Sequence, residues 1–175
     1  MEQRFIMTAF GRDRVGIVAD VTEIMYELGC NLEDATMTRL SDEFAIIFLF
    51  TSQDPELEPK LDTACRRLEH DKSVTAFFRP LGPEPLTPDL SLPRRTLHLE
   101  GVDQTGIVSR FSRFLANSRV NILFLQSERR FIPQSGTALY IVDMDVEIPY
   151  DLGLEAFQAE LRRLGDELHV EAKLT

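Results

Sequence analysis

The chain has 175 residues, of which 43% are hydrophobic and 27% are charged, and its formal net charge is −10. Twelve Phe residues supply apolar volume for packed cores, so the composition excludes a disordered chain. Nucleic-acid affinity rests on Lys and Arg that neutralise phosphates, so the acidic balance argues against direct nucleic-acid binding. No apolar run approaches the roughly 20 residues that span a bilayer, and the N-terminus lacks a signal-peptide pattern. We therefore expect a cytoplasmic protein that does not contact a membrane.

The first half of the chain alternates strand and helix signals. Apolar residues spaced three and four apart predict a helix. Gly29 stands at its C-terminal end, where a residue with a left-handed backbone is expected. Pro55 marks the start of a second helix, and 41–43 form a hairpin connection. The expected elements are a strand over 5–10, a helix with the stripe Val15, Val18, Val21, Met25 and Leu28, a strand over 32–40, a buried central strand over 44–50, a helix with Leu57, Leu61, Ala64 and Leu68, and a strand over 74–79.

Four prolines between 81 and 93 predict a stiff linker, after which the pattern restarts. The expected elements are strands over 96–100, 121–130, 138–146 and 169–174, with helices over 106–118 and 152–164. The connection 131–136 is three residues longer than its counterpart in the first half. We expect a first domain over 1–80, a linker over 81–93 and a second domain over 94–175.

Each half thus has the order β-α-β-β-α-β. In the ferredoxin-like arrangement this order places both helices on one face of a four-stranded antiparallel sheet. The sequence predicts an α+β protein made of two such domains in tandem.

The strongest signal is a repeated motif. The pattern G-x-D-x-x-G-I-V occurs at 11–18 and again at 101–108, and the same offset of 90 carries Asn31 onto Asn121. A glycine at the head of a helix leaves backbone N–H groups open to a carboxylate, and the Asp can cap the helix or meet an ammonium group. An amino acid carries both groups. The alternative is that Asp caps, Gly turns and Ile-Val pack, with no ligand.

The D-R-x-G-I-V run at 13–18, the Gly-Cys-Asn-Leu-Glu-Asp run at 29–34 and the element order resemble an ACT domain, a small-molecule-binding regulatory module. Residues 11–40, continuing into 42–44, resemble the first half of the glycine cleavage system transcriptional repressor family, whose members are tandem ACT proteins. The resemblance implies a cytoplasmic repressor that senses glycine or a similar small amino acid. It acts by contact with a regulator protein, a separate DNA-binding activator of glycine cleavage genes.

The resemblance also implies where the ligand binds. In ACT domains the ligand sits at the loop between the first strand and the first helix. The residues that match are Asp13, Arg14, Val15, Gly16, Ile17 and Asn31 in the first repeat, and Asp103, Gln104, Thr105, Gly106, Ile107 and Asn121 in the second. The family often has Pro before the second Gly, where this chain has Val15 and Thr105. At the offset of 90, Arg119 occupies the position equivalent to Gly29, so the second repeat lacks this glycine. We therefore expect sensing of the ligand to involve the first repeat.

The residues give weaker support to other classes of function. The three His and two Cys residues form no nucleophile–base set and no metal-ligand spacing, so we expect no enzyme, no cofactor and no metal. Cys30 and Cys65 are expected to be reduced structural thiols. Basic pairs such as Arg129-Arg130 are interpreted as solvated surface. The main alternative is a ligand-independent adaptor that pairs sheet edges, within a chain or in a homodimer. A regulatory subunit of an amino-acid metabolic enzyme is a further alternative.

Overall fold

The computed structural model describes residues 2–82, 92–132 and 136–175. The chain divides into two compact units, Met1–Thr87 and Pro88–Thr175. Most of the predicted linker over 81–93, and the middle of the connection 131–136, lie outside the described residues. Within the described ranges, no helix is both long and apolar enough to cross a membrane.

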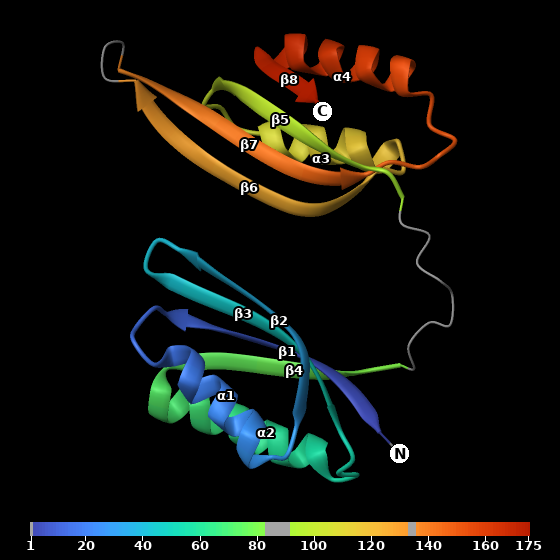
Figure 1. Ribbon diagram of the computed structural model, residues 1–175. Helices are drawn as coiled ribbons and strands as arrows, with labels where there is room; N and C mark the ends of the chain where they lie inside the picture. The colour runs from blue at the N-terminus through green and yellow to red at the C-terminus, as the bar shows by residue number, and fades with distance from the viewer. Residues whose placement is uncertain (1, 83–91, 133–135) are drawn as a thin grey trace. The chain divides into compact units, whose positions relative to one another are not determined.

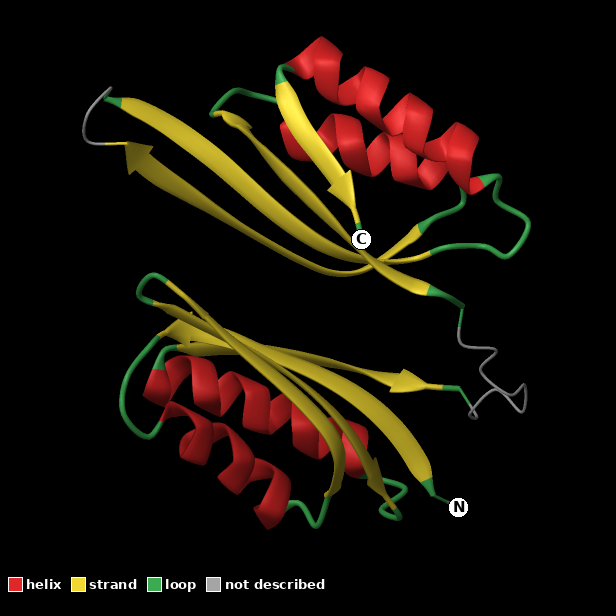
Figure 2. Cartoon of the chain, turned by 45° about the horizontal axis from the view of Figure 1, so that its top comes forward, coloured by secondary structure: helices red, strands yellow, loops and turns green. Residues whose placement is uncertain are grey.

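Unit 1 contains the predicted six elements (Figure 1). Its strands form one antiparallel sheet in the order β2-β3-β1-β4, so the first strand lies inside the sheet. Both helices cover the same face of this sheet (Figure 2). The elements are β1 (Gln3–Arg12), α1 (Ile17–Glu27), β2 (Asn31–Leu40), β3 (Glu43–Ser52), α2 (Leu57–Lys72) and β4 (Val74–Leu81).

Unit 2 repeats this topology in the order β6-β7-β5-β8, which confirms the predicted α+β fold in both halves. Its two helices again lie on one face of the sheet (Figure 2). The elements are β5 (Arg94–Val102), α3 (Ile107–Asn117), β6 (Asn121–Ile132), β7 (Thr137–Glu147), α4 (Leu154–Leu168) and β8 (Val170–Leu174).

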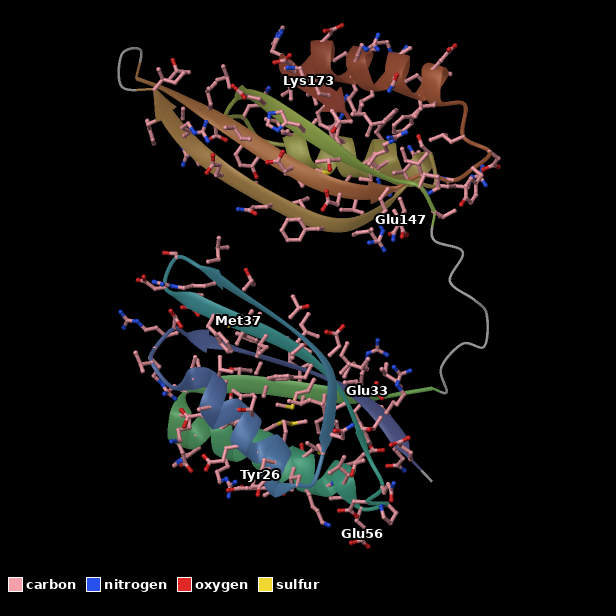
Figure 3. All side chains as sticks on the ribbon, in the orientation of Figure 1. Tyr26, Glu33, Met37, Glu56, Glu147 and Lys173 are labelled. Carbon is pink, nitrogen blue, oxygen red and sulfur yellow. The ribbon has the colours of Figure 1, made fainter. Side chains whose placement is uncertain are left out.

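The edge strands β2 and β6 carry the same irregularity. The register shifts between Leu32 and Asp34 in β2, and between Ile122 and Phe124 in β6, which are equivalent positions at the offset of 90. The extra residue in β2 is Glu33, labelled in Figure 3, whose carboxylate accepts a 3.1 Å hydrogen bond from Arg4 Nε. A bulge increases the local twist of an edge strand, so both edges bend at the same place.

The predicted apolar stripe of the first helix is wrong at its start. Val15 lies in the turn before α1 and is fully exposed, and Val18 is half-exposed. The residues that α1 buries are Ile17, Val21, Ile24 and Met25. Because Gly16 has a left-handed backbone, the helix begins only at Ile17, and its buried face starts from that residue. The stripe of α2 is confirmed, since Leu57, Leu61, Ala64 and Leu68 are all buried.

The strand predicted as a buried central strand is central but buried on one face only. Phe44, Ile46, Phe48 and Phe50 belong to the core under the helices. Ile47 points to the opposite face and is 45% exposed. Antiparallel sheets commonly keep one face free of helices. In this strand the residues that point to either face are apolar, so the sequence alone does not distinguish the covered face from the open one.

Helices α1 and α3 end in the same hydrogen-bonded motif. The N–H of Gly29 donates to Tyr26 O and that of Cys30 to Met25 O, while Arg119 donates to Ala116 O and Val120 to Leu115 O. These are the two bonds of a Schellman ending, which needs a left-handed residue. Gly29 (φ 65°) and Arg119 (φ 58°) both adopt that conformation, so the missing glycine of the second repeat does not change the helix ending.

Candidate functional site

The two loops that precede α1 and α3 have the same backbone. Gly16 (φ 89°, ψ −3°) and Gly106 (φ 99°, ψ −3°) are the residues at the heads of the helices, and neither helix has a side-chain cap. A Cβ added at either glycine would meet nothing within 4 Å. The glycines are therefore required for positive φ, and each helix head opens to free space.

The first glycine of each motif has a different role. A Cβ on Gly11 would stand 2.9 Å from Ser73 O, and one on Gly101 would stand 2.8 Å from His169 O. Gly11 lies in β1 and Gly101 lies in β5, each one residue before the end of its strand. They pair with the first residues of β4 and β8, respectively. They allow the close approach of two backbones.

The motif Asp does not cap the helix, so that interpretation was wrong. Asp13 Oδ2 lies 2.9 Å from Arg39 Nε, and Asp103 Oδ2 lies 2.7 Å from Arg129 Nε. The N–H of Asp13 also donates to Asp42 O in the β2–β3 hairpin at 2.7 Å, and that of Asp103 donates to Ala138 O. Each Asp thus ties its loop to the neighbouring hairpin.

Arg39 and Arg129 are candidate site residues that the sequence analysis did not identify. Arg39 and Arg129 are separated by the same offset of 90 as the motif, which is the signal that could have found them. Arg129 had been interpreted as part of a solvated basic pair. It is exposed, but its guanidinium pairs with Asp103 and lies 5.9 Å from the centre of the Phe131 ring. Each loop therefore presents a carboxylate and a guanidinium side by side.

The residue after the motif Asp links the loop to the second helix of its unit, by different chemistry in each. Arg14 lies 2.5 Å from Asp20 Oδ2, and Lys72 at the end of α2 lies 3.2 Å from Asp20 Oδ1. Hydrogen bonds from Arg14 and then Lys72 lower the pKa of Asp20 from its usual value. In unit 2, Gln104 Nε2 donates directly to the carbonyl of Leu168 at the end of α4.

The structure does not bring Asn31 to the loop of its own unit. Asn31 begins β2 beyond the far end of α1, an 11-residue helix about 16 Å long. It pairs with Thr51, whereas the loop adjoins the Phe44 end of β3. Asn121 holds the equivalent place in unit 2. The other predicted residues, 13–17 and 103–107, are contiguous, so one ligand can contact them without the Asn of the same unit.

In the part of the chain that the structure describes, no group of three or more His, Cys, Asp or Glu residues could hold a metal ion. Both cysteines are free, and burial raises the pKa of Cys30 and of Cys65 to about 11. At neutral pH they are therefore thiols and not thiolates. His98 Nδ1 lies 2.6 Å from Asp143 Oδ1 on the sheet face away from the helices.

Comparisons with known proteins bear on the family and the fold. Residues 3–79 match the family model of the ACT domain. A 46-residue segment is 41% identical to the glycine cleavage system transcriptional repressor of Escherichia coli, and this is 26% of the present chain and 24% of the repressor. The chain spans less than two thirds of the length of the curated relatives it matches.

Two solved structures share the fold over nearly the whole chain. An unknown protein from Galdieria sulphuraria is 26% identical, with a TM-score of 0.82 over 99% of this chain and 98% of that one. A proposed glycine cleavage system transcriptional repressor is 20% identical, with a TM-score of 0.73 over 100% of this chain and 97% of that one. Residues 3–79 thus match the ACT-domain family model, unit 2 repeats the fold of unit 1, and a 46-residue segment of the chain is similar to the glycine cleavage system transcriptional repressor.

Proposed function

We propose that the chain is an amino-acid-responsive regulatory protein whose ligand binds at the loops 13–17 and 103–107. The observation that carries the proposal is the duplicated loop in which an uncapped helix head lies next to an Asp–Arg pair. The role is regulatory and not catalytic, as the ACT match and the repressor relative suggest.

The loop chemistry suits a small zwitterion. First-turn N–H groups and the helix dipole attract a carboxylate at Gly16. Arg39 adds a second group for the same carboxylate, and the second oxygen of Asp13 is available to an ammonium group. Because positive and negative groups alternate within one loop, an amino acid fits better than a simple anion. The open space at Gly16 favours a small ligand such as glycine.

Regulation in this proposal works through a protein partner. The E. coli relative is named a transcriptional repressor of the glycine cleavage system. The described residues of this chain form two sheet-and-helix units with no helix-turn-helix, and the net charge is −10. We infer that the chain acts in the cytoplasm on a separate DNA-binding regulator.

A thermal-shift and calorimetric titration with glycine, alanine and serine tests the ligand. A ligand that binds only the folded state stabilises it by about 2.7 kcal/mol at 100 times its Kd. Arg39→Gln is expected to abolish the response of unit 1, and Arg129→Gln that of unit 2. Arg66→Gln, which removes an exposed arginine paired within α2, is the matched control and should respond like the parent protein. A response that all three variants retain would place the ligand elsewhere.

A second candidate is a ligand-independent adaptor that pairs its sheet edges with a partner. It is favoured by β2, an edge strand whose ten residues are all exposed. The same titration separates the two functions, because an adaptor of this kind shows no stabilisation by any amino acid.

A further inference from the structure

The two proposed ligand loops differ in the hairpin that carries the arginine of their Asp–Arg pair. In unit 1 the ladder of the β2–β3 hairpin ends at Leu40, one residue beyond Arg39, and the chain then turns. In unit 2 the ladder of the β6–β7 hairpin (Figure 1) continues to Ile132, three residues beyond Arg129. The hairpin of unit 2 therefore reaches further past its loop than the hairpin of unit 1.

The longer ladder places an aromatic side chain beside the Asp–Arg pair of unit 2. Phe131 stands two residues after Arg129, so both side chains leave the same face of β6. The centre of the Phe131 ring lies 5.9 Å from Arg129 Cζ, while Arg129 Nε lies 2.7 Å from Asp103 Oδ2. Because the Phe131 side chain is 65% exposed, most of the ring surface is open to a ligand.

The backbone holds the ring at the same place by a second route. Phe131 pairs with Ala138 in the ladder, and the carbonyl of Ala138 accepts a 3.0 Å hydrogen bond from the N–H of Asp103. Side chains of directly paired residues lie on the same face of a sheet, so the neighbour of the ring across the ladder is a methyl group. The ring thus stands next to the start of the loop and is not covered by a large side chain from β7.

Unit 1 has different chemistry at the equivalent place. At the offset of 90, Phe131 corresponds to Ser41, which lies in the hairpin turn with a left-handed backbone (φ 56°). Arg39 Nε donates a 3.3 Å hydrogen bond to the carbonyl of Ser41, whereas Arg129 meets the Phe131 ring. The pair of unit 1 therefore adjoins a polar turn, and the pair of unit 2 adjoins an aromatic ring.

We propose that the loop 103–107 binds an amino acid with a large apolar side chain, and that Phe131 determines this specificity. The inference rests on the proposed function, in which the helix head and the arginine of the pair hold the ligand carboxylate. In unit 2 a ligand held by Arg129 has its side chain next to the Phe131 ring, because the ring and the guanidinium are neighbours. Phe131 thus acts on the part of the ligand that differs between amino acids.

The energetic reason is the burial of apolar surface. A leucine or phenylalanine side chain that covers the ring removes apolar surface of both partners from water, and an aromatic ligand can also stack on the ring or meet its edge. Glycine has no side chain to bury and gains nothing from the ring. In unit 1 the polar Ser41 takes the place of the ring, so the loop 13–17 keeps its preference for a small ligand. The two units then sense amino acids of different size.

Calorimetric titration of the full-length chain with glycine, leucine and phenylalanine tests the inference one unit at a time. Arg39→Gln disables the loop of unit 1, so the remaining binding belongs to unit 2 and is expected to favour phenylalanine and leucine over glycine by about tenfold. Arg129→Gln disables the loop of unit 2, and the remaining binding should show no preference for the large side chains. Circular dichroism confirms that each variant is folded.

The decisive variant adds Phe131→Ala to Arg39→Gln. It should weaken the binding of phenylalanine and leucine about tenfold, and that of glycine less than about twofold. Phe124→Ala in the same background is the matched control and should leave all three affinities unchanged. It removes another exposed phenylalanine of β6, which pairs with Asp145 on the other face of the sheet.

Two outcomes separate this inference from the proposed function. Equal affinities for the three amino acids in the Arg39→Gln variant, or a Phe131→Ala effect that is the same for glycine and phenylalanine, would overturn the inference. The proposed function would stand in that case, because amino acids still bind at the loops. A chain that binds no amino acid would overturn both.

Discussion

The glycine loops of the two units have nearly the same backbone conformation, but they are attached to the rest of their units by different contacts. Gly16 and Gly106 differ by only 10° in φ and share the same ψ. Both loops are tied to a hairpin by an Asp–Arg pair, but the tie to the second helix is a charge cluster around Asp20 in unit 1 and a neutral amide in unit 2. The two units thus share the loop proposed to bind the ligand, and they differ in how that loop is attached to the second helix.

The sheet faces that lie away from the helices differ even more. In unit 1 this face carries apolar side chains, including Phe10, Ile47 and Phe77, the last 57% exposed. In unit 2 the equivalent face carries polar groups, among them His98 and Asp143. The side chains under the helices stay apolar in both. Duplication therefore preserved the core and left each surface free to change.

The largest expected difference between the units concerns the first glycine of the motif. Gly101→Ala should lower the free energy of unfolding by about 2–3 kcal/mol, because its Cβ would stand within 3.1 Å of three atoms of His169 and Val170. Gly11→Ala should cost about 1–2 kcal/mol, since only Ser73 O lies closer than 3.4 Å. Urea denaturation followed by circular dichroism measures both. Equal losses would show that the two central strands are equally crowded.

A smaller difference is expected at the end of the first helix of each unit. Arg119 pays for a left-handed conformation that Gly29 adopts freely. Arg119→Gly should be about 1 kcal/mol more stable than Arg119→Ala, because both lose the 2.8 Å ion pair with Asp151 and only glycine relaxes the backbone. Thermal unfolding of the two variants measures this difference. A glycine variant no more stable than the alanine variant would contradict it.

The charge cluster of unit 1 predicts that the attachment of its loop depends on pH, whereas the corresponding attachment in unit 2 uses the neutral amide of Gln104. The folded-state pKa of Asp20 is lowered, so its contribution to stability is present above its ordinary pKa of about 3.9 and is lost as pH falls through the lowered value. Asp20→Asn should therefore destabilise the protein at pH 7, and the gap to the parent should close below about pH 4. Urea midpoints at a series of pH values check this. A gap that stays constant with pH would exclude ionisation of Asp20 as the cause.

The prediction with the smallest expected effect concerns the two cysteines and needs no substitution. Both cysteines of the chain lie in unit 1, and burial raises the pKa of each thiol to about 11. Labelling with a thiol reagent at pH 7.5 should be slow in the folded protein and fast in urea. Its rate then reports the opening of unit 1 alone, and unit 2 is followed by the total loss of circular dichroism. Fast labelling without denaturant would mean that unit 1 opens locally.

The fold was predictable because its signals are local. Strand alternation, helix spacing and turn residues specify each element, and the repeat supplied a second copy of every signal. The start of α1 was predicted wrongly because the left-handed Gly16 delays the helix, which no spacing of Val15 and Val18 reveals. The Arg39–Asp13 pair was missed because it joins residues far apart in the sequence, and only the folded hairpin brings them together. Arg119 shows that the backbone hydrogen bonds of the helix ending can hold a residue other than glycine in the left-handed conformation.

The central place of β1 in its sheet has a consequence for synthesis of the chain. Its partners are β3 and β4, and Arg4 pairs with Leu81. At about 5–20 residues per second, a ribosome takes roughly 4–15 s to pass from one to the other. During that time an apolar strand with Phe5 and Met7 waits without its second neighbour, and β5 then waits in the same way for β8. A nascent chain of this topology therefore exposes an apolar inner strand twice during synthesis, once in each unit.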